Sequence, residues 1–337
     1  MDTFTHIAIG ACIGEAFFNK TIGKKAMFLG AMAHSIPDLD FLASFWMDSS
    51  SFLLAHRGFT HSFLFSISMI LLLSLLAFYF QKTYFIKLSK WVLFFSVSIL
   101  LHIFIDAFNN YGVGWFEPFS HYRISFNAMY VLDPFFSIWF FIAFFGLLNL
   151  NSKSVNRTKI WQYTFGITAF YLVYCMYNKS MVDQEINNSF KKQHIQYSTF
   201  ISTPAPLQNW LWYFVAKNDI GFYIGYYSIF DTNKLIPVTY FLKNDSLIQS
   251  FDLNEELTHL IRFSQGYYTI EKRSDTLVFN DLRFGEVLSC QKLKEHFVFH
   301  YFLNQPKSNT LVVQRGRFSG WDLNTFKCLI HRIEGFH

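Results

Sequence analysis

The chain has 337 residues, of which 52% are hydrophobic, 21% aromatic and only 15% charged. Its formal net charge of +5 is small and scattered, which argues against a nucleic-acid-binding protein. The cysteines Cys12, Cys175, Cys290 and Cys328 show no CxxC spacing, which argues against thiolate zinc sites and redox motifs; Cys290 and Cys328 either pair in an oxidising compartment or stay free thiols.

Residues 1–180 are dominated by long apolar runs. A helix needs about 20 such residues to cross a bilayer. Two weaker candidates, 3–19 and 26–43, are interrupted by ionisable residues, so each is either a half-span or a helix buried in the bundle. The sequence therefore predicts an α-helical integral membrane bundle of four to six transmembrane helices, with clear spans at 63–80, 91–108, 131–148 and 160–177.

Basic residues indicate the orientation of these helices. Lysines and arginines gather between the first and second, third and fourth, and fifth and sixth predicted helices, at 20–25, 82–90 and 153–159. The alternate loops hold only Arg57 and Arg123. Since short basic loops remain cytoplasmic, the N-terminus and the C-terminal domain are predicted to be extracytoplasmic.

Residues 181–337 have the composition of a soluble domain. Short aromatic and β-branched stretches with period-2 character, bounded by Gly, Asn, Asp and Lys, predict antiparallel strands. Asp281 and Arg283 are two apart on one strand face and are expected to form a salt bridge, and 322–333 reads as a closing amphipathic helix with Asp322 near its start. We expect a β-rich domain with strands within 221–230, 236–242, 266–272, 276–282, 297–303 and 310–316.

Histidines and aspartates of the membrane part fall on the predicted outer side, in separate segments. Each charged side chain at the bilayer centre costs roughly 2.5–3.5 kcal/mol, so these residues must be solvated, paired or bound to cations. Histidine and aspartate without cysteine suit zinc, or manganese or another first-row divalent ion. The candidate metal ligands are His6, Asp38, Asp40, His56, His61, His102 and Asp106.

Spacing supports this ligand set. His102 and Asp106 are four apart and share one face of a predicted helix. In the sequence PDLD, Pro37 breaks the preceding helix, and Asp38 and Asp40 alternate in the turn that follows. One of these two carboxylates would ligate while the other holds a histidine, and the spacing does not say which.

The sequence HRGFTHS, 56–62, is expected to bring His56 and His61 to the same place by folding back as a loop. Arg57 between them either anchors the chain at lipid phosphates or stabilises an anionic substrate oxygen. His34 lies on an otherwise small and apolar helix, so we expect it to be structural rather than a ligand.

The motifs DxxxH at the N-terminus, PDLD, HRGFTHS and HIFIDAFNNYG resemble the YdjM/YbcI-type family of bacterial membrane-bound predicted metal-dependent hydrolases, over roughly residues 1–135. The resemblance implies the bacterial inner membrane, and ligands at His6, Asp38 or Asp40, His56 or His61, His102 and Asp106. The order of these residues is also similar to zinc-dependent phospholipase C and P1-type nucleases. Those enzymes use a further HxxxE motif, which is not found after Asp106, so we expect one or two ions, with zinc favoured.

These observations predict metal-assisted hydrolysis, with a carboxylate among Asp38, Asp40 and Asp106 as base and Arg57 at the substrate. A site at the outer membrane surface favours a phosphoester of a lipid or other amphiphile, with membrane lipids as partners. Two alternatives are a structural or regulatory metal protein without turnover, and a transporter that uses intramembrane His and Asp as a relay. For the transporter, Glu15 would be the sole carboxylate toward the inner side.

Overall fold

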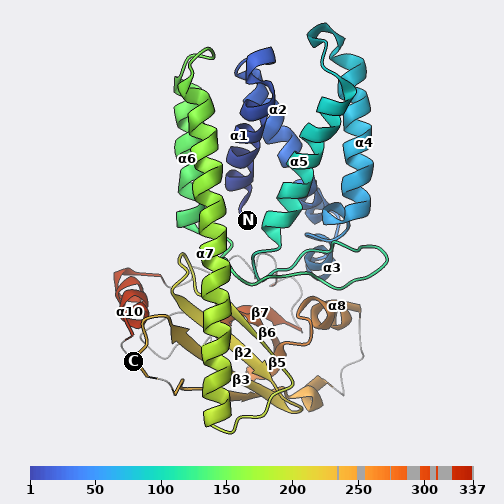
Figure 1. The fold of residues 1–337 in the computed structure, drawn as a ribbon. Helices are drawn as coiled ribbons and strands as arrows, with labels where there is room; N and C mark the ends of the chain where they lie inside the picture. Colours follow the sequence, from blue (N-terminus) through green and yellow to red (C-terminus); the bar gives the residue numbers. More distant parts are fainter. Residues whose placement is uncertain are drawn as a thin grey trace. The chain divides into compact units, whose positions relative to one another are not determined.

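The structure is a computed structural model that describes residues 1–233, 235–248, 255–273, 275–286, 297–303, 309 and 321–335 (Figure 1). It divides into two compact units. The helical unit comprises Met1–Phe45 and Ala55–Met176. The sheet unit comprises Trp46–Leu54 and Tyr177–His337, so a short segment from within the predicted membrane domain belongs with the C-terminal part of the chain.

The helical unit contains α1 (Thr3–Ile22), α2 (Lys25–His34), α4 (Phe63–Phe80), α5 (Leu88–Asp106), α6 (Pro134–Asn149) and the first part of α7 (Asn156–Lys192). Three 3-10 segments, η1 (Pro37–Phe45), η2 (Phe59–His61) and η3 (Lys82–Tyr84), connect them. Within the described residues, α4 and α5 are the helices long and apolar enough to cross a membrane, and α6 is a shorter apolar helix. The remaining candidate spans stay predictions.

Helix boundaries follow local chemistry. The 63–80 prediction coincides with α4, whose first turn is capped by Ser62: the side-chain oxygen accepts from the Phe65 N–H. The stretch 26–43 is not one helix, because α2 ends at His34 ahead of Pro37 and the chain continues as η1. A ten-residue helix rises about 15 Å, half the thickness of a bilayer core, so α2 cannot span it alone.

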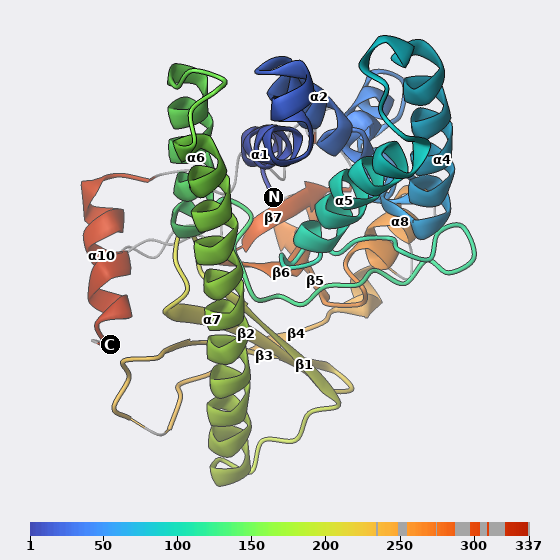
Figure 2. The same cartoon turned by 45° about the horizontal axis from the view of Figure 1, so that its top comes forward.

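Glycines allow α1 and α2 to pack with their backbones almost in contact. A Cβ added to Gly30 would lie 2.0 Å from the Gly10 carbonyl oxygen, and one added to Gly14 would lie 1.9 Å from the Ala26 carbonyl oxygen. Small residues on facing helices permit this close approach in membrane proteins. The pair also packs against α5, so three helices lie side by side (Figure 2).

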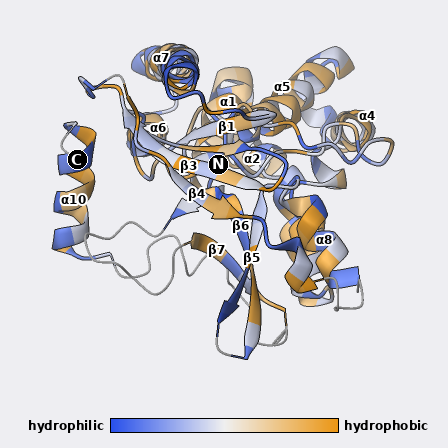
Figure 3. Ribbon diagram, turned by 90° about the horizontal axis from the view of Figure 1, so that it is seen from below, coloured by the Kyte–Doolittle hydropathy of each residue, from blue (hydrophilic) through white to orange (hydrophobic). Residues whose placement is uncertain are grey.

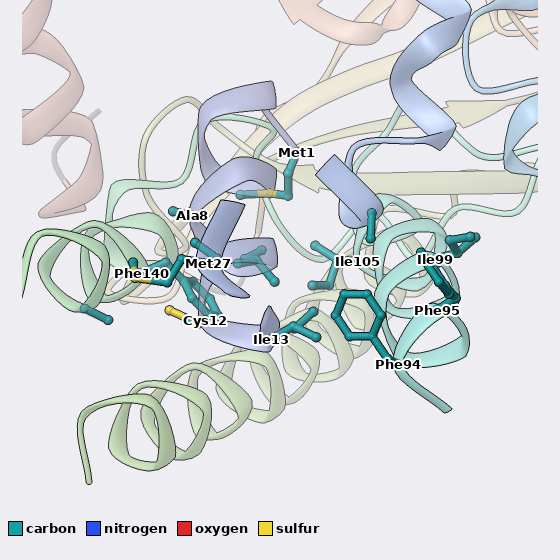
Figure 4. Close-up of a cluster of buried hydrophobic side chains, with 14 of the residues drawn as sticks. Met1, Ala8, Cys12, Ile13, Met27, Phe94, Phe95, Ile99, Ile105 and Phe140 are labelled. Carbon is teal, nitrogen blue, oxygen red and sulfur yellow. The ribbon is translucent and has the colours of Figure 1, made fainter. Parts of the chain in front are cut away.

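Apolar side chains from α1, α2, α5 and α6 fill the centre of the helical unit (Figure 4). One charged pair is buried with them. Arg157 Nε donates to Glu15 Oε1 at 2.8 Å and Arg157 Nη2 to Glu15 Oε2 at 2.5 Å, and both side chains are almost fully buried. This bidentate pair joins α1 to the start of α7, and it gives Glu15, the carboxylate predicted toward the inner side, a fixed structural partner.

Among its described residues, the sheet unit holds two antiparallel sheets. The first has the order β1 (Thr199–Pro204), β2 (Leu211–Lys217), β3 (Gly221–Ser228), β4 (Thr239–Leu242); the second has β5 (Tyr268–Arg273), β6 (Thr276–Glu286), β7 (Phe297–Phe302). The C-terminal part of α7 packs on the first sheet through Val182, Ile186 and Phe190. The remaining elements are α3 (Ser49–Ala55), η4 (Asp245–Ile248), α8 (Glu255–Phe263) and α10 (Leu323–Ile333), and α8 and α10 both carry hydrophobic and hydrophilic residues (Figure 3).

The expected antiparallel strands within 221–303 are confirmed, and 310–316 lies outside the described residues. β1 and β2 were not predicted; β2 is buried along nearly its whole length, so it lacks the alternation of a half-exposed strand. The Asp281–Arg283 salt bridge is present at 2.6 Å, and Asp322 caps α10. Cys328 is disulfide-bonded and so is not a free thiol; its predicted pairing with Cys290 lies outside the described residues.

Candidate metal centre

One group of four ligand side chains comes from three segments of the helical unit. Asp38 lies on η1, His61 ends η2, and His102 and Asp106 lie one turn apart on α5. Each residue offers one ligand atom, and all four atoms lie within 4.8 Å of one another. We call Asp38, His61, His102 and Asp106 the mixed group.

Distances within the mixed group match those around a single ion. His61 Nε2 lies 3.3 Å from His102 Nε2 and 3.4 Å from Asp106 Oδ2, and His102 Nε2 lies 3.4 Å from Asp38 Oδ1. His61 Nε2 lies 3.8 Å from Asp38 Oδ1, and His102 Nε2 lies 3.8 Å from Asp106 Oδ2. Ligand atoms about 2.0–2.2 Å from a tetrahedral zinc are separated by about 3.3–3.6 Å, so these spacings suit one ion with little rearrangement.

Asp40 lies behind His61 rather than in the mixed group. His61 Nδ1 is 3.0 Å from Thr60 Oγ1, and the Thr60 hydroxyl donates to Asp40 Oδ2 at 3.3 Å. His61 Nδ1 also lies 3.5 Å from the same carboxylate oxygen. A hydroxyl and a carboxylate behind Nδ1 place the proton on that nitrogen, so Nε2 presents its lone pair to the mixed group.

The environment keeps Asp40 ionised. It accepts the Arg57 backbone N–H at 2.7 Å and lies 3.2 Å from His56 Nδ1. Burial acts to raise the pKa of Asp40, but the hydrogen bond with His56 and the nearby imidazoles outweigh burial and hold the pKa below its usual value. An ionised Asp40 can therefore orient His61 at neutral pH.

A second group, His6, His34 and His102, consists only of imidazoles, and all three side chains are fully buried. We call it the histidine group. His6 Nδ1 lies 3.2 Å from His34 Nε2, and the His6 ring stacks on His102 with centroids 3.8 Å apart. His102 belongs to both groups. His34, which the sequence favoured as structural, thus lies beside two other imidazoles; the glycines at 10, 14 and 30 could have indicated its approach to His6.

Arg57 is buried, and its guanidinium contacts protein groups on all three nitrogens. Nε lies 3.1 Å from Asp106 Oδ2, Nη1 donates to Asn109 Oδ1 at 2.7 Å, and Nη2 donates to the Met1 carbonyl at 3.0 Å. The Asp106 carboxylate also accepts from the Met1 amino group. In this arrangement Arg57 positions Asp106, and its predicted contact with substrate would require these bonds to change.

His56 lies at the edge of the centre. Its side chain is 33% exposed, it is held by Asp40, and it falls in neither group. Asp2 caps α1 by accepting the Thr5 N–H. His121 is exposed and paired with Glu117 at 2.8 Å, also apart from both groups in the part of the chain that the structure describes.

Three buried polar atoms of the mixed-group residues have no hydrogen-bond partner among the described residues: Asp38 Oδ2, His102 Nδ1 and Asp106 Oδ2, the last of which lies 3.1 Å from Arg57 Nε. An unpaired buried polar atom costs about 1–3 kcal/mol, a cost that a metal–ligand bond would remove. Nitrogen and carboxylate ligands without thiolates fit zinc, manganese or another first-row divalent ion. The residues present therefore fit a bound metal.

Sequence comparison identifies known proteins that are similar to this chain. A sequence model of the family described as YdjM inner membrane protein matches residues 1–182, which include every residue of both groups. The uncharacterized protein YfhP of Bacillus subtilis (strain 168) is 22% identical over an alignment that covers 95% of each chain. The inner membrane protein YbcI of Escherichia coli (strain K12) is 33% identical over 121 residues, 35% of this chain and 68% of YbcI. No solved structure matches the chain.

Proposed function

Since the chain belongs to the YdjM family of inner membrane proteins, we propose that it is a membrane-bound, metal-dependent hydrolase that cleaves a phosphoester of a lipid or another amphiphile. One observation carries the proposal. His61 Nε2 faces His102 and Asp106 at 3.3–3.4 Å while Thr60 and Asp40 hold its Nδ1, the arrangement by which carboxylates orient metal-binding histidines.

A divalent ion bound by Asp38, His61, His102 and Asp106 would supply Lewis acidity to a phosphoester oxygen and to water. The protein side chains hold the ion and accept the proton. Asp38 is 15% exposed, whereas His61, His102 and Asp106 are fully buried, so Asp38 is the most exposed ligand of the mixed group. Its Oδ2 has no hydrogen-bond partner among the described residues, and in our mechanism it takes the proton from the attacking water.

Exposed apolar side chains beside the ligands support an amphiphilic substrate. Phe41 on η1 is 51% exposed and Phe59 on η2 is 49% exposed, each within three residues of a mixed-group ligand. The start of α4 follows directly, where the Phe63 N–H donates to the Trp115 carbonyl at 2.9 Å. Aromatic residues at the ends of apolar helices are typical of the membrane–water interface.

We place this end of the helices, the N-terminus and the sheet unit outside the cytoplasm, in a multi-pass topology. The alternation of basic and non-basic loops supports that side. The disulfide at Cys328 also supports it, because disulfides persist in oxidising compartments. A transporter is less favoured, since Glu15, its candidate inner relay residue, is tied to Arg157.

The test combines metal content and turnover on detergent-purified protein. The substrates are bis(p-nitrophenyl) phosphate and vesicles containing phosphatidylglycerol. We expect bound zinc or manganese and metal-dependent phosphoester cleavage, both retained in His121→Ala, whereas Asp38→Asn should lose the mixed-group ion and most of the cleavage. Bound metal with no turnover on either substrate would favour the structural or regulatory alternative.

A further inference from the structure

We propose that the histidine group is a second metal position, with nitrogen ligands from His6, His34 and His102, adjacent to the mixed group and sharing His102 with it. The inference rests on the proposed function for the ion in the mixed group, and it adds a second ion of different chemistry. The argument begins from the protons of two buried imidazoles.

His34 has a fixed tautomer. Its Nδ1 lies 2.6 Å from the Ser98 carbonyl oxygen, and because a carbonyl only accepts, the proton of His34 is on Nδ1. His34 Nε2 therefore presents a lone pair. This nitrogen points at His6 Nδ1, 3.2 Å away.

His6 is fixed in the same way from its other side. Its Nε2 lies 3.1 Å from Asp106 Oδ1, the carboxylate oxygen that accepts from the Met1 amino group while Arg57 Nε pairs with Oδ2, so the proton of neutral His6 is on Nε2. His6 Nδ1 is then a lone pair too. Two nitrogen lone pairs facing each other at 3.2 Å repel unless a cation lies between them.

The spacing fits a metal ion as that cation. Two nitrogens on one tetrahedral zinc, each about 2.0–2.1 Å from it, lie about 3.3 Å apart, close to the 3.2 Å observed between His6 and His34. His102 supplies the third nitrogen. Its Nε2 faces the mixed group, and its Nδ1 is buried and lacks a hydrogen-bond partner among the described residues.

The ligand chemistry distinguishes the two positions. Three imidazoles select zinc, copper, nickel or cobalt, whereas magnesium and calcium prefer oxygen ligands. All three rings are fully buried, so this ion is shielded from substrate and ties α1, α2 and α5 together. Binding to both nitrogens of His102 requires the ring to lose its last proton, so the second ion binds with release of one proton.

Zinc stoichiometry tests the proposal on full-length protein in detergent. Wild-type protein stripped of metal is titrated with zinc against a chromophoric chelator, which counts sites without any substitution. We expect two zinc ions in wild type and in His121→Ala, one in His34→Gln, one in Asp38→Asn and none in His102→Ala, with folding checked by thermal melts.

A single zinc in wild type that persists in His34→Gln would overturn the second position and leave the proposed hydrolytic site intact. Loss of all zinc in His34→Gln that remains folded would also overturn it, because the two positions would then be one. Wild-type protein that binds no zinc would refute this inference and the zinc centre of the proposed function together.

Discussion

Replacing Gly30 by alanine should separate α1 from α2 and disable the histidine group. The added Cβ would lie 2.0 Å from the Gly10 carbonyl oxygen and 2.5 Å from the Gly14 backbone nitrogen. Both neighbours are backbone atoms, so no side-chain rotation relieves the clash. Ordinary contact begins at 3.4 Å, and the helices must therefore move apart by about 1.4 Å.

The displacement acts on the metal centre because His34 lies one turn further along α2. An equal shift of His34 would open its 3.2 Å separation from His6 to about 4.6 Å, too wide for two ligands of one ion. Overpacking of this kind costs about 1–3 kcal/mol. Alanine gains about 1 kcal/mol over glycine within a helix, so we expect a net loss of up to about 2 kcal/mol.

Gly166 on α7 is the matched control, since a Cβ there meets no described atom within 4 Å. Thermal unfolding in detergent and zinc content are measured for Gly30→Ala and Gly166→Ala side by side. We expect lower stability and loss of the histidine-group zinc for Gly30→Ala alone. If the two variants unfold at the same temperature and hold the same zinc, the close helix packing does not position His34 as argued.

Three further predictions concern charge and exposure. Glu15→Gln leaves buried Arg157 without its carboxylate and should lower the free energy of unfolding by about 3–5 kcal/mol. Glu15→Gln combined with Arg157→Met should lower it less, as measured by thermal melts. Equal losses in the single and double variants would refute the pairing. Burial raises the pKa of Glu286 to about 7 from 4.5, so as pH rises the unfolded chain loses the Glu286 proton before the folded chain does. The free energy of unfolding should therefore fall, by on the order of 2 kcal/mol, between pH 4.5 and pH 7. The corresponding change in the unfolding midpoint should be absent in Glu286→Gln. Phe119 is 84% exposed, and we expect it to lie at the membrane interface. A polarity-sensitive dye attached to the Phe119→Cys variant in phosphatidylcholine vesicles should be quenched by spin-labelled lipid, whereas the same dye on Asp219→Cys should not. Equal quenching of the two variants would show that Phe119 is not at the interface.

Local features of the fold were accessible from sequence because they depend on residues near one another in the chain. The apolar run 63–80 is α4 to the residue, and the two-residue spacing of Asp281 and Arg283 forms the expected salt bridge. Asp322 caps α10 as its position indicated. Buried β2 was missed, since a strand covered on both faces has no alternation to detect.

The list of candidate ligands likewise came from residue type and side of the membrane, and most of those residues meet in the mixed group or beside it. Sequence could not rank Asp38 against Asp40, because both follow the same proline turn. Their tertiary neighbours distinguish their roles: Asp38 faces His102, and Asp40 faces the loop that carries His61.

The sequence by itself determined a helical membrane part, a sheet-rich remainder and a set of His and Asp residues that had to be solvated, paired or bound to a cation. Tertiary structure alone decided that His34 reaches His6, which nitrogen of each ring carries a lone pair, and that Glu15 pairs with Arg157 across 142 positions. The physical reason is the range of the interactions. Periodicity and capping act within a few residues, whereas a ligand set depends on how closely separate helices pack, here on three glycines between α1 and α2.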